Sequence, residues 1–153
     1  MATVLVDYDG TLADTRQRRH IIDGAESPDW RAYSLACAGD RPIRGVIRVL
    51  DLISLGDVVI VWSGGHECSR KIRERWLGRA GVRYDELLLR PDDVTLDNVS
   101  LKLGFLRDLQ ARGFQPSLAI DDHPGVLEAL SARRIPGLLV ARDGVARAYK
   151  PSR

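Results

Sequence analysis

The sequence contains little cysteine, no long apolar run and no large excess of charge of either sign. Its two cysteines, Cys37 and Cys68, form an isolated pair and belong to no Cys/His cluster with zinc spacing. No apolar stretch approaches the roughly 20 residues that a membrane helix needs, and no basic segment with an apolar core follows Met1. We therefore expect a cytoplasmic protein with no membrane partner.

The charges nearly balance: 23 Lys and Arg stand against 21 Asp and Glu, a formal net charge of +2. Such a small excess suits an anionic substrate but does not establish nucleic-acid binding. With 153 residues, 44% hydrophobic and 29% charged, the chain has the size and composition of one globular domain. We expect a single domain over residues 1–153, and the sequence gives no indication of its oligomeric state.

Five short apolar runs have the character of buried strands, and segments with helical periodicity lie between them. The runs cover residues 3–6, 58–62, 87–89, 117–120 and 138–141. Between the first two, Ile43, Val46, Ile47, Leu50 and Ile53 recur at the spacing of one helix face. This alternation predicts an α/β fold, with a mostly parallel five-stranded sheet and helices on both of its faces.

One segment, from about residue 14 to 42, interrupts this alternation after the first strand. It contains the basic residues Arg16, Arg18 and Arg19 and the aromatic Trp30. A connection of that length in a compact α/β domain is usually a lid or a binding loop. We expect a small cap inserted beside the active site, with Trp30 as a candidate for stacking on a base.

Polar residues follow the expected strands at the edge where an open parallel sheet binds its ligands. Asp7-Tyr8-Asp9-Gly10-Thr11 ends the first strand, Ser63-Gly64-Gly65 the second and Asp121-Asp122 the fourth. Lys102 lies near the start of the helix before the fourth strand. Four carboxylates, a hydroxyl and a lysine are therefore expected to converge on one edge.

Carboxylates packed together raise one another's pKa, and a hard divalent cation with oxygen ligands relieves that cost. We predict a Mg²⁺ site formed by Asp7, Asp9, Asp121 and Asp122, without deciding which of the last two binds directly. Once Mg²⁺ and Lys102 offset the charge, Asp7 can attack phosphorus. Asp9 lies on the same side of the extended segment and is the candidate general acid and base.

Ser63 and the amides near Gly64 and Gly65 are candidate phosphate contacts, because we expect these residues to open a helix. Thr11 is assigned to the same site.

Structural alternatives exist for each motif. The two aspartates could cap the helix that begins near Pro124, Ser63 could be only a helix cap, and Lys102 could be a surface lysine. The basic run of residues 70–75 is by default a solvated helix face.

The segment Asp7–Thr11 matches the DxDGT signature and resembles the haloacid dehalogenase-like (HAD) phosphatase superfamily. Ser63, Lys102 and Asp121-Asp122 follow in that superfamily's order. The resemblance implies a Rossmann-like sheet, a Mg²⁺ cofactor, and a phosphoaspartyl intermediate that forms on Asp7 with the help of Asp9.

A narrower resemblance is to the 3′-phosphatase domain of bacteriophage-type polynucleotide kinase/phosphatase. It is carried by Ser63-Gly64-Gly65, by residues 73–76, 80–82 and 118–122, and by Arg90 and Lys102. It implies a phosphatase acting on 3′-phosphate ends of DNA or RNA and adds Arg90 to the substrate-binding residues. Two features depart from that family. Gly65 stands where it usually has arginine, and no GxxxxGK[ST] phosphate loop is present, so we expect a free-standing phosphatase.

Two other functions compete with this interpretation. A nucleotidase or small-metabolite phosphatase would use the same catalytic residues, because the scaffold does not determine the substrate. A non-catalytic receiver module would also combine acidic residues, a hydroxyl and a lysine. Receivers carry the acceptor aspartate on their third strand, however, and here that strand ends in Leu89-Arg90. The sequence therefore favours an enzyme.

Overall fold

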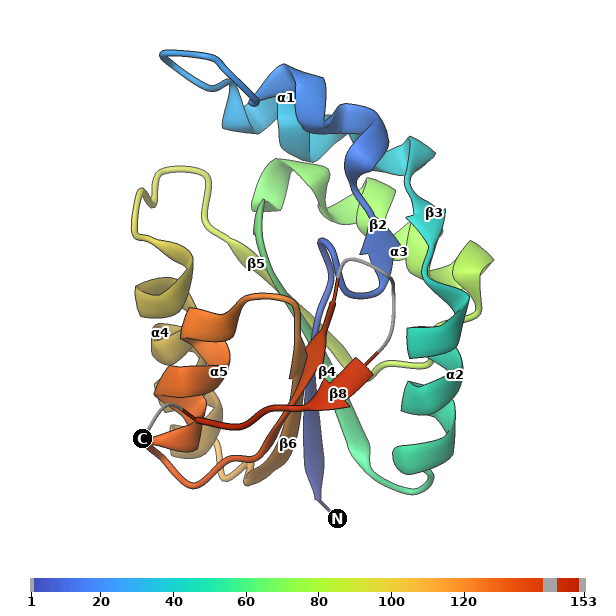
Figure 1. The fold of residues 1–153 in the computed structure, drawn as a ribbon, viewed down its shortest axis with the longest axis vertical. Coiled ribbons are helices and arrows are strands. Elements are labelled where there is room, and N and C mark those ends of the chain that lie inside the picture. The colour runs from blue at the N-terminus through green and yellow to red at the C-terminus, as the bar shows by residue number, and fades with distance from the viewer. Residues whose placement is uncertain (1, 142–145, 152–153) are drawn as a thin grey trace.

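A mixed six-stranded sheet forms the centre of the molecule (Figure 1) in the computed structural model, which describes residues 2–141 and 146–151. The two ends of the expected domain, Met1 and Arg153, lie outside the described residues. The strand order is β5-β4-β1-β6-β7-β8, and every neighbouring pair is parallel except β7 and β8. The strands are β1 (Thr3–Asp7), β4 (Val58–His66), β5 (Glu86–Arg90), β6 (Pro116–Asp121), β7 (Gly137–Val140) and β8 (Ala146–Ala148).

The five strands expected from the apolar runs are confirmed, but the expected number of strands was one too few. The additional strand, β8, is three residues long and pairs antiparallel with β7. Its sequence, Ala-Arg-Ala, has no apolar run to mark it. The second expected strand also continues four residues beyond Trp62, to His66, so Ser63, Gly64 and Gly65 belong to β4 and do not open a helix.

Two pairs of helices cover the two faces of the sheet (Figure 1). On one face lie α2 (Arg44–Ile53) and α3 (Arg70–Ala80), which contribute the buried Leu50 and Trp76 to the core there. On the other lie α4 (Asn98–Ala111) and α5 (Pro124–Ser131). The layered α/β architecture follows from the alternating strands and helices. Among the described residues, no helix is both long and apolar enough to cross a membrane.

The insert after β1 is helical and is bounded by a two-stranded antiparallel ribbon. Its elements are β2 (Ala13–Asp14), the 3₁₀ helix η1 (Arg16–Ile21), α1 (Trp30–Leu35), the 3₁₀ helix η2 (Ala36–Gly39) and β3 (Arg41–Pro42). In Figure 1 this segment lies beyond the carboxyl ends of the parallel strands. It therefore stands over the edge of the sheet at which ligands bind in open α/β folds.

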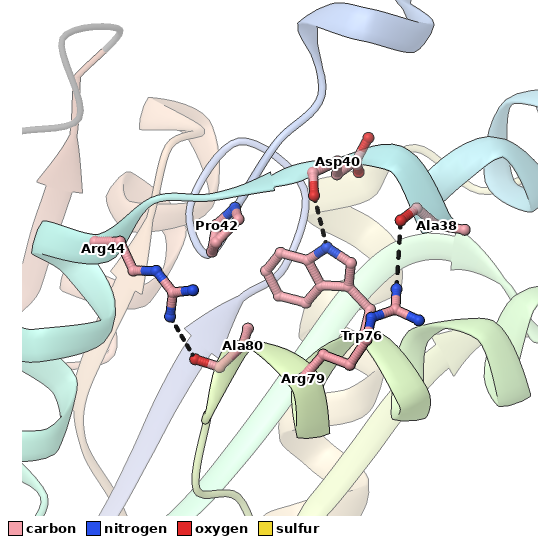
Figure 2. Close-up of a pocket in the computed structure, with 7 residues that line it drawn as sticks. All are labelled: Ala38, Asp40, Pro42, Arg44, Trp76, Arg79 and Ala80. Carbon is pink, nitrogen blue, oxygen red and sulfur yellow. Dashed lines mark hydrogen bonds between the residues drawn. The ribbon is translucent and has the colours of Figure 1, made fainter.

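The return of the insert to the sheet is anchored on α3 (Figure 2). The buried Trp76 donates from Nε1 to the carbonyl oxygen of Asp40 at 2.8 Å, and Arg79 donates to the carbonyl oxygen of Ala38 at 3.4 Å. A hollow of about 180 Å³ lies at this junction. The carbonyl of Asp40 is thus tied to α3, while its carboxylate accepts hydrogen bonds from Gln17 and Arg18 of the insert.

Candidate active site

The strand β1 delivers Asp7 to the carboxyl edge of the sheet, where its side chain is almost fully buried. Lys102 on α4 donates from Nζ to Oδ1 of Asp7 at 2.6 Å and to Oδ2 of Asp121 at 2.7 Å. Thr11 donates from Oγ1 to Oδ2 of Asp7 at 2.9 Å. The carboxylate is thus oriented through both of its oxygens. Lys102 is itself only 3% exposed, which excludes the alternative of a surface lysine.

Three of the four expected carboxylates form a cluster. Ligand oxygens of Asp7, Asp121 and Asp122 all lie within 4.8 Å of one another. Burial raises the pKa of Asp7 well above its usual range, and Asp121 and Asp122 add to the effect against the opposing charge of Lys102. Desolvation and the charge of Asp121 raise the pKa of Asp122 to about 6. These carboxylates are destabilised in their ionised form, the condition that a bound cation relieves.

The fourth carboxylate, Asp9, has different partners. Its Oδ1 accepts hydrogen bonds from Arg18 and, at 3.1 Å, from Nη1 of Arg73, and its Oδ2 accepts from Oγ of Ser63 at 2.9 Å. Burial opposes ionisation of Asp9, but Arg73 and Arg18 outweigh it and hold its pKa well below the usual range. The side chain of Asp9 is therefore ionised and is engaged by guanidinium groups next to the acidic cluster.

The end of β4 is held by hydrogen bonds within the site. The amide of Gly65 donates to Oγ of Ser63 at 2.9 Å, so that Ser63 links Gly65 to Asp9. Arg90 donates from Nε to the carbonyl oxygen of Gly64 at 2.9 Å and from Nη2 to Oδ1 of Asn98 at 2.9 Å. Arg90 thus ties the Gly64 backbone to the start of α4. Ser63 is fully buried in a strand, which excludes a role as a mere helix cap.

The alternative of a helix cap also fails for the aspartate pair. His123 is the N-cap of α5, and its Nδ1 accepts from the amide of Val126 at 3.3 Å. Oδ1 of Asp121 accepts from the amide of His123 at 2.9 Å, while Oδ2 faces Lys102. Pro124 occupies the first turn, as expected from the sequence. Because His123 caps the helix, the carboxylate of Asp122 is available to the acidic cluster.

Sequence reasoning missed two arginines of the site. The sequence places Arg18 among the basic residues of the insert and Arg73 on a solvated helix face, yet both side chains are 0% exposed. Arg18 bridges Asp9 and Asp40, and its guanidinium lies 4.1 Å from the centroid of the Tyr33 ring. The signal available for Arg73 was its place three residues before Trp76, which puts both side chains on the buried face of one helix.

The comparisons agree with this geometry. A family model described as "Polynucleotide kinase PNKP phosphatase domain" matches residues 1–143. A search of curated proteins finds no match. Among solved structures, a chain of a Pnkp1/Rnl/Hen1 RNA repair complex has a TM-score of 0.68 and 26% identity, over 91% of this chain and 42% of that chain. This protein therefore spans less than half the length of that relative.

A haloacid dehalogenase-like hydrolase of Streptococcus pneumoniae has a TM-score of 0.64 over 92% of this chain and 85% of its own. At 12% identity, this likeness establishes the shared fold only. It agrees with the Rossmann-like arrangement of the sheet, and the family model covers every strand from β1 to β7. The chain belongs to the PNKP phosphatase domain family and is a phosphatase of the HAD type.

Proposed function

We propose that this domain is a Mg²⁺-dependent phosphomonoesterase that removes 3′-phosphates from nucleic-acid ends through a phosphoaspartyl intermediate on Asp7. The observation that carries the proposal is the setting of Asp7, a buried carboxylate oriented by Thr11 and Lys102 beside two further aspartates. Carboxylates act as covalent nucleophiles toward phosphoryl groups when they are positioned and their charge is balanced. The family to which the chain belongs supports the same reaction class.

The donor set of the acidic cluster fits magnesium. Asp7, Asp121 and Asp122 offer hard carboxylate oxygens, and Mg²⁺ in proteins is usually held by one or two carboxylates with waters completing the shell. When bound, the cation supplies positive charge that offsets the carboxylates and the incoming phosphate. Burial and the neighbouring carboxylates raise the pKa of Asp7 and of Asp122 against the opposing charge of Lys102.

In the first half of the proposed reaction, a carboxylate oxygen of Asp7 bonds to phosphorus while the bond from phosphorus to the ester oxygen breaks. The leaving sugar oxygen takes a proton from Asp9. That carboxylate is ionised in the structure described here, held so by Arg73 and Arg18. A phosphate dianion next to Asp9 opposes its charge and raises its pKa, so that Asp9 takes up a proton from solvent on substrate binding and passes it to the leaving oxygen.

In the second half, water attacks phosphorus and the bond to Asp7 breaks, releasing inorganic phosphate. Asp9, now ionised again, accepts the proton of the attacking water. Ser63 and Arg90 maintain the site during both halves, because Ser63 hydrogen-bonds to Asp9 and Arg90 holds the carbonyl of Gly64. We assign Gly64 and Gly65 to the phosphate pocket through their backbone, and Thr11 to the orientation of Asp7.

The choice of nucleic-acid ends rests on the family and on the insert. The relative of known structure is part of an RNA repair complex. In this chain, the insert places an aromatic side chain, Trp30, and a cation, Arg31, on α1, and both are exposed. Trp30 packs edge-on against Tyr33, with 5.9 Å between ring centroids, which leaves a ring surface for a base. We regard the insert as the substrate-binding cap of a cytoplasmic enzyme.

The test compares a 3′-phosphorylated oligonucleotide, its 5′-phosphorylated counterpart and a nucleoside 3′-phosphate, each with Mg²⁺ and with excess chelator. We expect the highest kcat/KM for the 3′-phosphorylated oligonucleotide, a loss of all activity in chelator, and a preference for the oligonucleotide over the nucleoside 3′-phosphate that shrinks as salt rises. Equal or better hydrolysis of the small substrates at low salt would support the nucleotidase alternative. Full activity in chelator would refute the metal requirement.

A further inference from the structure

Gly65 leaves a space that the side chain of Arg73 occupies. A Cβ atom added at Gly65 would overlap Nη2 of Arg73 and lie 2.5 Å from its Cζ and 3.0 Å from its Nε. The backbone of Gly65 does not have a positive φ, so other residues could adopt its conformation. Space, and not backbone geometry, is therefore the reason for glycine at this position.

Arg73 enters this space from α3 and is held on several sides. Its Nε donates to Oγ of Ser69 at 2.8 Å, and its Nη1 donates to Oδ1 of Asp9 at 3.1 Å. Its guanidinium lies 4.4 Å from the centroid of the buried Tyr8 ring. The whole residue is 0% exposed. A long cationic side chain is thus fixed against the carboxylate that the proposed mechanism uses as acid and base.

One nitrogen of this guanidinium has no partner. Nη2 of Arg73 is buried and has no hydrogen-bond acceptor among the described residues, although it is the atom nearest to Gly65. A buried unpaired donor on a charged group is costly, and natural cores rarely retain one without a purpose. An arginine whose only task was to stabilise the core would be expected to pair all of its nitrogens. The arrangement instead leaves a donor free at the active site.

We propose that Gly65 and Arg73 act as a pair: glycine at position 65 leaves the space through which the guanidinium of Arg73 reaches Asp9. Arg73 is a positioning residue: it holds Asp9 at the place from which Asp9 gives its proton to the leaving oxygen. Replacing Gly65 with any larger residue displaces Arg73 and misplaces Asp9. This inference rests on the proposed function, because it assigns Arg73 its role through Asp9.

The experiment measures two substrates with Arg73→Ala, Gly65→Arg and the double variant. Nucleoside 3′-phosphate has a poor leaving group that needs a proton, whereas p-nitrophenyl phosphate has a good one. We expect Arg73→Ala to lower kcat for the nucleoside 3′-phosphate by about 100-fold, the scale of a general acid, and to lower kcat for p-nitrophenyl phosphate much less. Gly65→Arg alone should also lose activity, since the Cβ atom of the new side chain would overlap the guanidinium of Arg73.

The double variant Gly65→Arg/Arg73→Ala should turn over the nucleoside 3′-phosphate within about twofold of the Arg73→Ala rate, because both substitutions remove the same contact with Asp9. Arg75→Ala, which removes an exposed arginine of the same helix, is the matched control and should leave both rates unchanged. Equal losses on the two substrates, or a double variant whose loss is the product of the two single losses, would overturn the inference while wild-type activity upheld the proposed function.

If the wild type hydrolyses neither substrate, thermal unfolding still tests whether Gly65 and Arg73 share a space. Gly65→Ala should lower Tm in the wild-type background but not in the Arg73→Ala background, because the added Cβ atom then meets empty space. Such coupling would retain the shared space of Gly65 and Arg73 and reject only the phosphatase activity. Additive changes in Tm would show that Gly65 and Arg73 do not share a space, and the inference would fall.

Discussion

Gly10 and Asp122 approach so closely that a Cβ atom at Gly10 would overlap Oδ2 of Asp122. Gly10 also has a φ of +83°, a conformation that side chains other than glycine adopt at a cost. The tight turn after β1 and the position of an acidic-cluster carboxylate are therefore determined together. The glycine of the first motif serves the proposed metal site as well as the backbone.

We expect Gly10→Ala to weaken Mg²⁺ activation of the phosphatase severely, because the new methyl group pushes the Asp122 carboxylate away. Gly24→Ala is the matched control: Gly24 has a φ of +74°, but nothing lies within 4 Å of its added Cβ atom. Both variants should lose stability on the order of 1 kcal/mol from backbone strain. Activity titrated with Mg²⁺ should change for Gly10→Ala alone, and a similar shift in both variants would contradict this account.

Arg18 is expected to matter for both stability and catalysis. It connects Asp9 to Asp40, and the side chains of Arg18 and Asp40 are fully buried. Removing one partner of a buried ion pair leaves an uncompensated charge, so Arg18→Ala should cost about 3–5 kcal/mol of unfolding free energy. It should also lower kcat, because Asp9 loses a partner. Denaturant unfolding and steady-state kinetics measure the two effects.

The control for Arg18 is Arg16→Ala. Arg16 pairs with Asp14 at the surface, where its side chain is 85% exposed. Exposed ion pairs contribute little to stability, so this variant should unfold like the wild type. An Arg18→Ala protein as stable and as active as Arg16→Ala would show that the buried bridge has no role in the site.

Ionisation of Asp122 should make the stability of the metal-free protein depend on pH. Its pKa is raised from 3.8 to about 6, so the folded protein is favoured while the group is protonated. This contribution is present below pH 3.8 and is lost as the pH rises toward 6. The Tm of Asp122→Asn minus that of wild type, both in chelator, should therefore increase between these two values. A constant difference would contradict the raised pKa.

Trp30 should affect only the polynucleotide substrate. It is 51% exposed on α1 of the insert and is not part of the acidic cluster. Loss of one base–aromatic stacking contact costs roughly 1–3 kcal/mol, so Trp30→Ala should raise KM for a 3′-phosphorylated oligonucleotide by about 5- to 150-fold. Hydrolysis of p-nitrophenyl phosphate should be unchanged. Equal losses on both substrates would show that Trp30 supports the fold and does not bind nucleic acid.

The sequence predicts the catalytic edge because short-range patterns encode it. Asp7 and Asp121 each end an apolar run that forms a strand. Because the strands are parallel, their carboxyl ends lie at the same edge of the sheet. The surroundings of Asp9 could not be predicted in this way. Its bond to Arg18 joins the sheet to the insert, and its bond to Arg73 spans 64 positions. Whether an arginine in a polar helix faces solvent or a buried carboxylate depends on tertiary packing.

The strand β8 and the end of β4 show the same limit on a smaller scale. A three-residue edge strand is formed by pairing with β7 and has no periodicity of its own. The continuation of β4 through two glycines runs against local propensity, since glycine weakens strand interiors. Here the close approach of Asn98 to Gly64 and of Arg73 to Gly65 requires residues without side chains.

The central claim is that Asp7 forms the covalent bond to phosphorus, and chemical trapping tests it most directly. Borohydride added during turnover of a 3′-phosphorylated oligonucleotide with Mg²⁺ reduces an aspartyl phosphate to homoserine, which mass spectrometry locates in the peptide that contains both Asp7 and Asp9. We predict homoserine at position 7, aspartate unchanged at position 9, and no reduction without substrate or in Asp7→Asn. Turnover with unmodified Asp7, or reduction at position 9, would contradict the account.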